Sequence, residues 1–176
     1  MKKYIITESQ MDILVNGLKE SEFYDLIPKD IKNLVYIFNK AGYKLFVVGG
    51  AVRDFLLGKK PKDFDLATDA TPEIINDLLK DKYKIHEVGR QFGLSKVSTK
   101  YFPEGIEIVT FRKDIGKGRR PDSVEFTDVK NDALRRDLTI NALYYDVVNK
   151  KILDFVGGVD DIKNKVIRTV GNPSLR

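Results

Sequence analysis

Two aspartates separated by one residue, Asp63 and Asp65, are the side chains of this sequence best suited to hold a cation. The stretch from Asp63 to Thr68 alternates polar and apolar residues, which predicts a β-strand with both carboxylates on one side. Paired carboxylates suit Mg²⁺, which takes one or two protein carboxylates and completes its octahedron with waters and substrate phosphates. An Asp-x-Asp pair alone is common in solvated turns, so this interpretation needs support from neighbouring elements.

That support comes from a glycine pair, Gly49-Gly50, which follows the apolar run 44–48. This order predicts a buried strand, a tight turn and a short helix over 51–57. Backbone N–H groups at such a turn can approach a phosphate closely, and Arg53 adds a forked cationic group. A glycine pair before a helix is most often a plain turn. A phosphate cradle and a carboxylate pair in consecutive elements nevertheless indicate a phosphate site beside a metal site.

Helical and strand periodicities are mixed along the rest of the chain, with no internal repeat and no low-complexity tract. Helical spacing of apolar residues occurs at 9–18, 29–41, 71–79, 131–141 and 160–165, and strand-like runs occur at 83–88, 94–101, 106–112 and 142–148. The basic, glycine-containing segment 113–121 predicts a loop. We therefore expect an α+β fold with a mixed β-sheet flanked by helices and an N-terminal helical extension.

Composition assigns the chemistry to carboxylates. The 176 residues contain no cysteine and a single histidine, His86, which excludes a thiolate metal site, a cysteine nucleophile and a histidine-pair metal site. The net charge of +5 weakly favours a polyanionic partner. No apolar run approaches the roughly 20 residues of a membrane helix, and the N-terminus lacks the apolar segment of a signal peptide. The sequence predicts a cytoplasmic protein without a membrane partner.

Five stretches together resemble a known family. They are GGAVRDFLLGKKPKDFDLATDATP from Gly49, VTFR from Val109, GRRPDSV from Gly118, LRRDLTINAL from Leu134 and DFVGGVDDI from Asp154. From about residue 28 to residue 173 the chain is similar to the nucleotidyltransferase superfamily typified by DNA polymerase β. The similarity is to the branch that holds bacterial CCA-adding enzymes and poly(A) polymerases. The resemblance implies a polymerase β-like nucleotidyltransferase head.

The resemblance also implies roles for individual residues. Asp63 and Asp65 match the catalytic metal ligands, and Glu107 is our candidate for the third catalytic carboxylate, which helps to take the proton from the attacking RNA 3′-hydroxyl. A solvent-facing strand residue is the alternative for Glu107. The positions expected to bind the nucleotide are Gly49, Gly50, Arg53, Arg112, Arg136, Asp137 and Asn141. The implied cofactor is Mg²⁺, and the implied partners are ATP, CTP and an RNA 3′ end, most simply that of tRNA.

The resemblance divides the chain into three parts. We expect an N-terminal helical extension over 1–25, a catalytic head over 26–150 and the start of a neck over 151–176. Relatives continue into a neck helix that selects the incoming base and into domains that grip tRNA. We expect either a truncated head or a minimal enzyme that takes RNA recognition from a partner chain or from its N-terminal helix. The loop departs from the family pattern at Lys117, which stands where the family pattern has an acidic residue.

Two functions from different classes stay open on the sequence. The first is Mg²⁺-dependent addition of CMP or AMP from CTP or ATP to an RNA 3′ end, by tRNA CCA addition or repair or by poly(A) addition. The second is a non-catalytic head that binds nucleotide or RNA as a regulatory module. A third interpretation, transfer of a nucleotide to a protein or a small molecule, has less support. The intact carboxylates and arginines favour the enzyme.

Overall fold

The computed structural model describes residues 20–86, 92–116 and 123–171. The helices are α2 (Glu20–Leu26), α3 (Lys29–Lys40), α4 (Gly50–Leu56), α5 (Pro72–Leu79), α6 (Val129–Leu134), the 3-10 helix η2 (Thr139–Asn141) and α7 (Gly158–Lys163). The strands are β1 (Leu45–Val48), β2 (Asp65–Thr68), β3 (Lys84–His86), β4 (Leu94–Ser98), β5 (Ile106–Thr110), β6 (Arg112–Ile115), β7 (Ser123–Phe126), β8 (Leu143–Asp146) and β9 (Lys151–Asp154). The helix expected at 9–18 lies outside the described residues.

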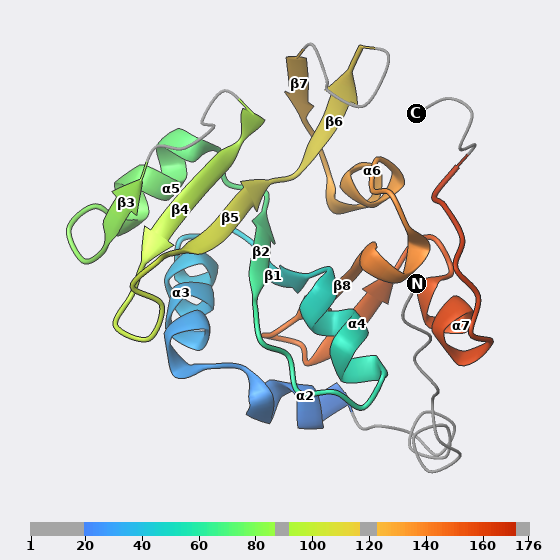
Figure 1. The fold of residues 1–176 in the computed structure, drawn as a ribbon. Coiled ribbons are helices and arrows are strands. Elements are labelled where there is room, and N and C mark those ends of the chain that lie inside the picture. Colours follow the sequence, from blue (N-terminus) through green and yellow to red (C-terminus); the bar gives the residue numbers. More distant parts are fainter. Residues whose placement is uncertain (1–19, 87–91, 117–122, 172–176) are drawn as a thin grey trace.

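A mixed sheet with the strand order β3-β4-β5-β2-β1-β8-β9 organises the molecule (Figure 1). Strands β2 and β5 run parallel, and the other neighbours in this sheet run antiparallel. Strands β6 and β7 form a separate two-stranded ribbon. The expected α+β fold with a mixed sheet and flanking helices is confirmed.

Helices α3 and α5 form as their sequences predict and pack on one face of the sheet. Helix α3 buries Ile31, Leu34, Val35 and Phe38, which recur at helical spacing on one side. Helix α5 begins at Pro72, and the preceding Thr71 side chain accepts a hydrogen bond from the Ile74 N–H. Both helices contribute to one large apolar cluster that also contains residues of α2 and α4. This cluster holds the helices against the sheet.

A smaller apolar cluster occupies the opposite face of the main sheet. Phe46 and Val48 of β1 pack there with Phe111 and Tyr144, and Ala133 of α6 closes the cluster. The rings of Phe111 and Tyr144 meet edge to face with centroids 6.3 Å apart. Helix α6 is thereby held against the sheet beside β1 and β8.

Three sequence predictions need correction. The expected loop 113–121 is wrong over its first part, because Arg112–Ile115 is strand β6 and pairs with β7. Gly116, directly after this strand, does not prevent residues 112–115 from pairing. The expected helix 131–141 is interrupted, because α6 ends at Leu134 and Leu138 is extended, with a β-bridge to Thr169. Strand β9 was not expected, and it pairs with β8 as the edge of the main sheet.

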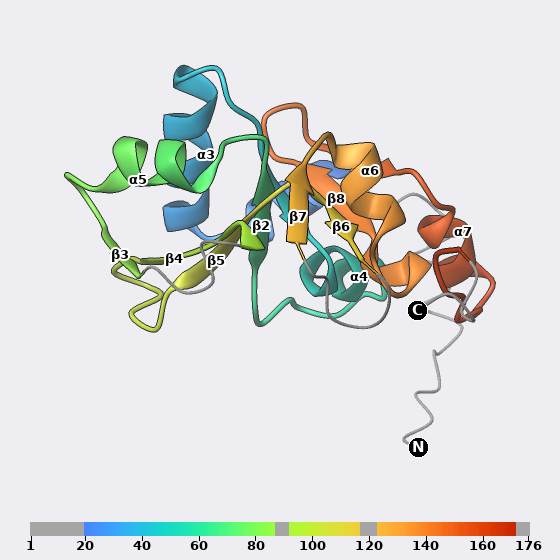
Figure 2. The same cartoon turned by 90° about the horizontal axis from the view of Figure 1, so that it is seen from above.

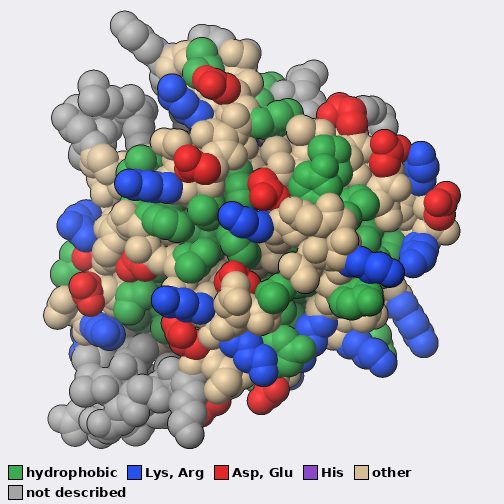
Figure 3. Space-filling view, turned by 180° about the vertical axis from the view of Figure 1, so that it is seen from behind, with side chains coloured by type: hydrophobic (Ala, Val, Ile, Leu, Met, Phe, Trp, Pro, Cys, Tyr) green, Lys and Arg blue, Asp and Glu red, His purple; other side chains and the backbone are tan. Residues whose placement is uncertain are grey.

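The face shown in Figure 3 carries acidic and basic side chains side by side around hydrophobic ones. The net charge of +5 is therefore not concentrated on this face of the molecule. None of the helices in the described ranges is both long enough and apolar enough to cross a membrane.

Helix α7 packs so closely on η2 that its first residue has no room for a side chain. A Cβ on Gly158 would lie 2.2 Å from the carbonyl oxygen of Thr139. The contact is held by Asp161, whose carboxylate accepts hydrogen bonds from the Thr139 hydroxyl at 2.5 Å and from Arg168 at 3.0 Å. Residue 158 is therefore a point at which α7 is fixed to η2.

We expect Gly158→Ala to lower the free energy of unfolding by about 2–3 kcal/mol, because the methyl group overlaps a backbone atom. Urea unfolding followed by circular dichroism measures this loss. Gly58→Ala is the control, because no atom lies within 4 Å of its built Cβ and only its φ of +67° opposes the substitution. The steric explanation is wrong if the two variants lose equal stability.

Candidate active site

The glycine pair forms the turn that the sequence predicts, directly at the end of β1. Gly49 adopts φ 74° and ψ −126°, a conformation that L side chains rarely adopt. Its N–H donates to the Leu143 carbonyl at 3.0 Å, and its carbonyl accepts from the Arg53 N–H at 3.1 Å. A Cβ on Gly49 would lie 3.7 Å from the Asn141 carbonyl oxygen and 3.9 Å from Arg136 Nη1. The turn therefore brings bare backbone against two predicted nucleotide-binding residues.

Arg53 connects the turn to η2. Its Nη1 donates to Asn141 Oδ1 at 2.6 Å, and its Nε and Nη2 donate to Asp54 Oδ1 at 3.0 and 2.8 Å. A Cβ on Gly50 would lie 3.6 Å from Arg53 Nη2. The Arg53 side chain keeps 30% of its surface exposed, so it is oriented by its neighbours and still accessible to a ligand.

The carboxylate of Asp65 belongs to β2, the strand that neighbours β1 and its turn. Asp65 is paired in register with Val48, the residue immediately before Gly49. The pKa of Asp65 is raised by partial burial and by the neighbouring carboxylates of Glu107 and Asp63, against an opposing effect of Arg136. The charges of the two other carboxylates that the sequence analysis selected, and the charge of Arg136, therefore all act on Asp65.

The predicted start of the second strand is wrong by two residues. Strand β2 begins at Asp65, and Asp63 belongs to the segment that leads into it. The alternating exposure expected of the strand nevertheless extends to Asp63, two residues before β2 begins. The buried Phe64 between them anchors the segment in the main apolar cluster, while both aspartates remain exposed.

Asp63 and Asp65 are the donors that could hold a cation in this site. The carboxylates of Glu107 and Asp63 contribute to the raised pKa of Asp65, and a bound cation would relieve this repulsion. Within the described ranges no three His, Cys, Asp or Glu residues form a complete metal cluster. A pair of carboxylates is nevertheless the protein contribution typical of Mg²⁺, with substrate phosphates and waters as the remaining ligands. The donor set therefore fits Mg²⁺.

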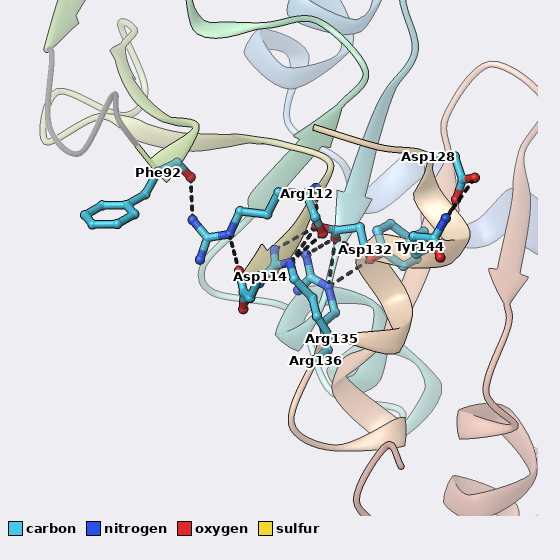
Figure 4. A network of polar contacts seen from close by, with 9 residues as sticks. Phe92, Arg112, Asp114, Asp128, Asp132, Arg135, Arg136 and Tyr144 are labelled. Carbon is cyan, nitrogen blue, oxygen red and sulfur yellow. Dashed lines mark hydrogen bonds and ion pairs between the residues drawn. The ribbon is translucent and has the colours of Figure 1, made fainter. Parts of the chain in front are cut away.

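Arg136 is held by a buried carboxylate and a buried tyrosine (Figure 4). Its Nε donates to the Tyr144 hydroxyl at 2.9 Å and its Nη2 donates to Asp132 Oδ2 at 3.1 Å. The guanidinium also lies over the Tyr144 ring, 5.2 Å from its centroid. The Tyr144 hydroxyl donates to Asp132 Oδ2 at 2.6 Å. These contacts fix Arg136 where its Nη1 faces the Gly49 turn.

Asp132 is a residue of this site that sequence reasoning missed. It is fully buried and also accepts hydrogen bonds from Arg135 Nε and Nη2, at 2.9 and 2.7 Å, and from the Arg112 N–H, at 3.1 Å. Burial alone would raise its pKa, but Arg136, Arg135, Tyr144 and the Arg112 N–H together hold the pKa below its ordinary value. The signal available in the sequence was its position three and four residues before Arg135 and Arg136, within the segment 131–141 that the sequence predicts to be helical.

Arg112 and Asp137 are placed differently from the other predicted nucleotide-binding residues. Arg112 lies 3.1 Å from Asp114 and donates through Nη1 to the Phe92 carbonyl. Its pKa is lowered by burial and by the nearby Arg135. Arg112 therefore joins the network around Asp132 rather than the Gly49 turn. Asp137 is exposed, and its carbonyl accepts from the Val170 N–H at 3.0 Å.

The chain matches a family model and curated proteins over most of its length. Residues 45–168 match the model of the poly(A) polymerase head domain. The chain is 43% identical over 164 residues to poly(A) polymerase I of Escherichia coli O157:H7, covering 85% of the chain and 34% of that protein. It is 43% identical over 146 residues to the CCA-adding enzyme of Bacillus pumilus, covering 81% of the chain and 35% of that protein.

Solved structures show the same fold. The Bacillus stearothermophilus CCA-adding enzyme in complex with CTP matches with a TM-score of 0.68 and 34% identity, covering 82% of this chain and 34% of that one. A tRNA nucleotidyltransferase complexed with a primer tRNA and an incoming ATP analog matches with a TM-score of 0.62 and 30% identity, covering 80% and 39%. The chain spans about a third of the length of these relatives. With the family model, these matches confirm the resemblance: the chain belongs to the poly(A) polymerase head domain family.

Proposed function

We propose that this chain is the catalytic head of a Mg²⁺-dependent nucleotidyltransferase that adds AMP or CMP from ATP or CTP to an RNA 3′ end in the cytoplasm. The observation that carries the proposal is the position of Asp65, which pairs in register with Val48 directly before the Gly49-Gly50 turn that Arg136 faces, and on which the charges of Glu107 and Asp63 act. The names of the relatives support the same reaction, since they include poly(A) polymerases and CCA-adding enzymes. The tRNA complex of one related structure favours tRNA as the acceptor.

In this proposal Asp63 and Asp65 hold the magnesium. When bound, Mg²⁺ neutralises charge on the transferred phosphate and lowers the pKa of the attacking hydroxyl. Glu107 lies beside Asp65 and takes the proton from the RNA 3′-hydroxyl. Arg136 partly offsets the effect of the two other acids on Asp65.

The Gly49-Gly50 turn and two arginines hold the triphosphate. Because glycine has no side chain, the backbone N–H groups of the turn can approach phosphate oxygens. The positive charges of Arg53 and Arg136 stabilise the negative charge of the leaving pyrophosphate. Asn141 orients Arg53 through the 2.6 Å hydrogen bond. Nucleotidyl transfer needs positioning and charge neutralisation more than covalent help, and these contacts supply both.

The proposal also assigns roles to Arg112 and Asp137. It extends to the selection of the base. Arg112 contributes through the Asp132 network, and Asp137 faces the ribose. Poly(A) polymerase and CCA-adding relatives match the chain at the same 43% identity, so the comparison supports both activities equally. Base selection and most of the RNA grip are proposed to come from segments outside this head or from a partner chain.

Extension of RNA by the purified chain tests the proposal. A tRNA lacking its 3′ end is incubated with Mg²⁺ and each labelled nucleoside triphosphate in turn. We expect lengthening of the RNA with ATP or CTP, and the pattern of use separates poly(A) addition from CCA addition. Nucleotide binding measured by calorimetry without incorporation of any nucleotide would instead support the non-catalytic head.

A further inference from the structure

Four side chains form a row across the main sheet at the level of the carboxylates. His86 of β3 is paired in register with Lys96 of β4, and Lys96 is paired with Glu107 of β5. Leu66 of β2 pairs with Ile108 of β5 in parallel register. Leu66 follows Asp65, and Ile108 follows Glu107. Asp65 is therefore level with Glu107. The row runs from His86 at the sheet edge through Lys96 and Glu107 to Asp65.

The row lies on a face of the sheet that the described helices leave uncovered. Val97 and Ile106 are buried in the main apolar cluster, and neighbouring residues of a strand point to opposite faces. Lys96 therefore points away from that cluster, as does the exposed Lys84. Figure 2 shows α3 and α5 on one side of β3, β4 and β5 and no helix on the other. We call this surface, formed by Lys84, His86, Lys96, Ser98 and Glu107, the open sheet face.

Lys96 is not neutralised by the acid opposite to it. In the parts of the chain that the structure describes, no ion pair joins Lys96 to Glu107. The aliphatic part of Lys96 lies over Gly105 instead, where a built Cβ would be 2.7 Å from Lys96 Cγ and 3.1 Å from Cε. The bare backbone of Gly105 thus supports the lysine stem. Beside it, His86 Nε2 lies 2.9 Å from Ser98 Oγ.

The geometry of the proposed reaction decides from which side RNA reaches the carboxylates. Strand β1, which ends in the Gly49-Gly50 turn, borders β2 on one side, and β5 borders it on the other. In an in-line transfer the attacking oxygen and the leaving pyrophosphate lie on opposite sides of the phosphorus. If the triphosphate lies by the turn, the RNA 3′-hydroxyl comes from the side of β5 and β4. The RNA strand then runs over the open sheet face.

We propose that the open sheet face binds the phosphodiester backbone of the last nucleotides of the RNA acceptor, with Lys96 and Lys84 neutralising its phosphates. This inference rests on the proposed function and specifies the path of its acceptor strand. Adjacent strands lie about 4.8 Å apart, so the Lys96 backbone is about 5 Å from that of Glu107 and about 10 Å from that of Asp65. Contacts with phosphates carry no sequence information, so the binding is independent of RNA sequence.

Binding of a 5′-fluorescein oligoribonucleotide, measured by fluorescence anisotropy over a range of salt concentrations, tests this inference. The variant Lys84→Ala/Lys96→Ala is compared with Lys40→Ala/Lys80→Ala, which removes the same charge from exposed positions on α3 and at the end of α5. We expect the first variant to bind RNA about tenfold more weakly. The slope of log K for RNA binding against log salt concentration should become shallower by about 1.4, roughly 0.7 for each lost phosphate contact. The second variant should bind RNA as the wild type does. ATP binding, measured by calorimetry, should be unchanged in both.

The outcomes separate this inference from the proposed function. Equal losses in the two double variants, an unchanged salt slope, or no RNA binding by the wild type would overturn the inference. Extension of RNA with a normal KM by Lys84→Ala/Lys96→Ala would also overturn it and leave the proposed function standing. A wild type that adds no nucleotide, but whose RNA binding still depends on Lys84 and Lys96, would overturn the function alone.

Discussion

Replacing Asp65 with Asn is expected to reduce nucleotide addition by about 10³-fold or more while the protein stays folded. Loss of a metal ligand removes several kcal/mol of stabilisation of the developing charge, and each 1.36 kcal/mol is a factor of ten in rate. The fold should not suffer, because the removed charge faces the carboxylates of Glu107 and Asp63. The measurement is single-turnover extension of a 5′-labelled RNA, accompanied by thermal unfolding.

Glu104→Gln is the matched control for this prediction. It removes the same charge from an exposed position between β4 and β5. We expect its rate of extension to be within twofold of the wild type, the range of ordinary surface changes. Activity of Asp65→Asn comparable to that of Glu104→Gln would show that Asp65 is not a catalytic ligand.

The second large effect is expected at Asp132, where Asn removes a buried charge that faces two arginines. Uncompensated burial of one partner of such an ion pair costs about 3–5 kcal/mol of unfolding free energy. Because Asp132 holds Arg136 beside the Gly49 turn, the KM for the nucleotide should also rise, by about tenfold. Urea unfolding measures the first effect, and initial rates at varied ATP concentration measure the second.

Acidification gives an independent signature of Asp132. Its pKa in the folded protein lies below the ordinary value of 3.8, so its contribution to stability is complete above that value and is lost as the pH falls through the folded pKa. The stability difference between wild type and Asp132→Asn should therefore be constant well above the ordinary pKa of 3.8 and shrink as the pH falls below that value. A difference independent of pH would contradict the assigned charge interaction.

Asp128→Asn provides the control for the Asp132 substitution. Asp128 caps the same helix, and its carboxylate accepts a hydrogen bond from the Asn131 N–H at 2.8 Å. Asn caps helices as well as Asp does, so we expect a stability change below about 0.5 kcal/mol. If Asp128→Asn is as damaging as Asp132→Asn, then the helix rather than the arginine network explains the loss.

The parts of the fold that local sequence determines were predicted well. Helix α3 follows from its apolar stripe, and α5 follows from Thr71 and Pro72 at its start. The Gly49 turn was also predictable, since its backbone conformation favours glycine. Each of these signals lies within a few residues of the structure that it produces.

The parts that were missed depend on residues distant in the chain. Strand β9 is short, and it exists because β8 offers it a partner and because Asp154 accepts the N–H groups that begin the next helix. Strand β7 similarly depends on β6. Asp132 acquires its role from Tyr144 and from the backbone of Arg112, which lies 20 residues away in the sequence. Spacing alone does not show such contacts.

The measurement that most directly tests the account is extension of a 5′-labelled RNA by the wild-type chain, with ATP and CTP, in Mg²⁺ and in excess EDTA. A sequencing gel resolves each added nucleotide. The account predicts products longer than the primer in Mg²⁺ and none in EDTA, with Asp65→Asn in Mg²⁺ matching the EDTA lane. Extension that persists in EDTA, or primer that stays unextended in Mg²⁺ although ATP binds, would contradict it.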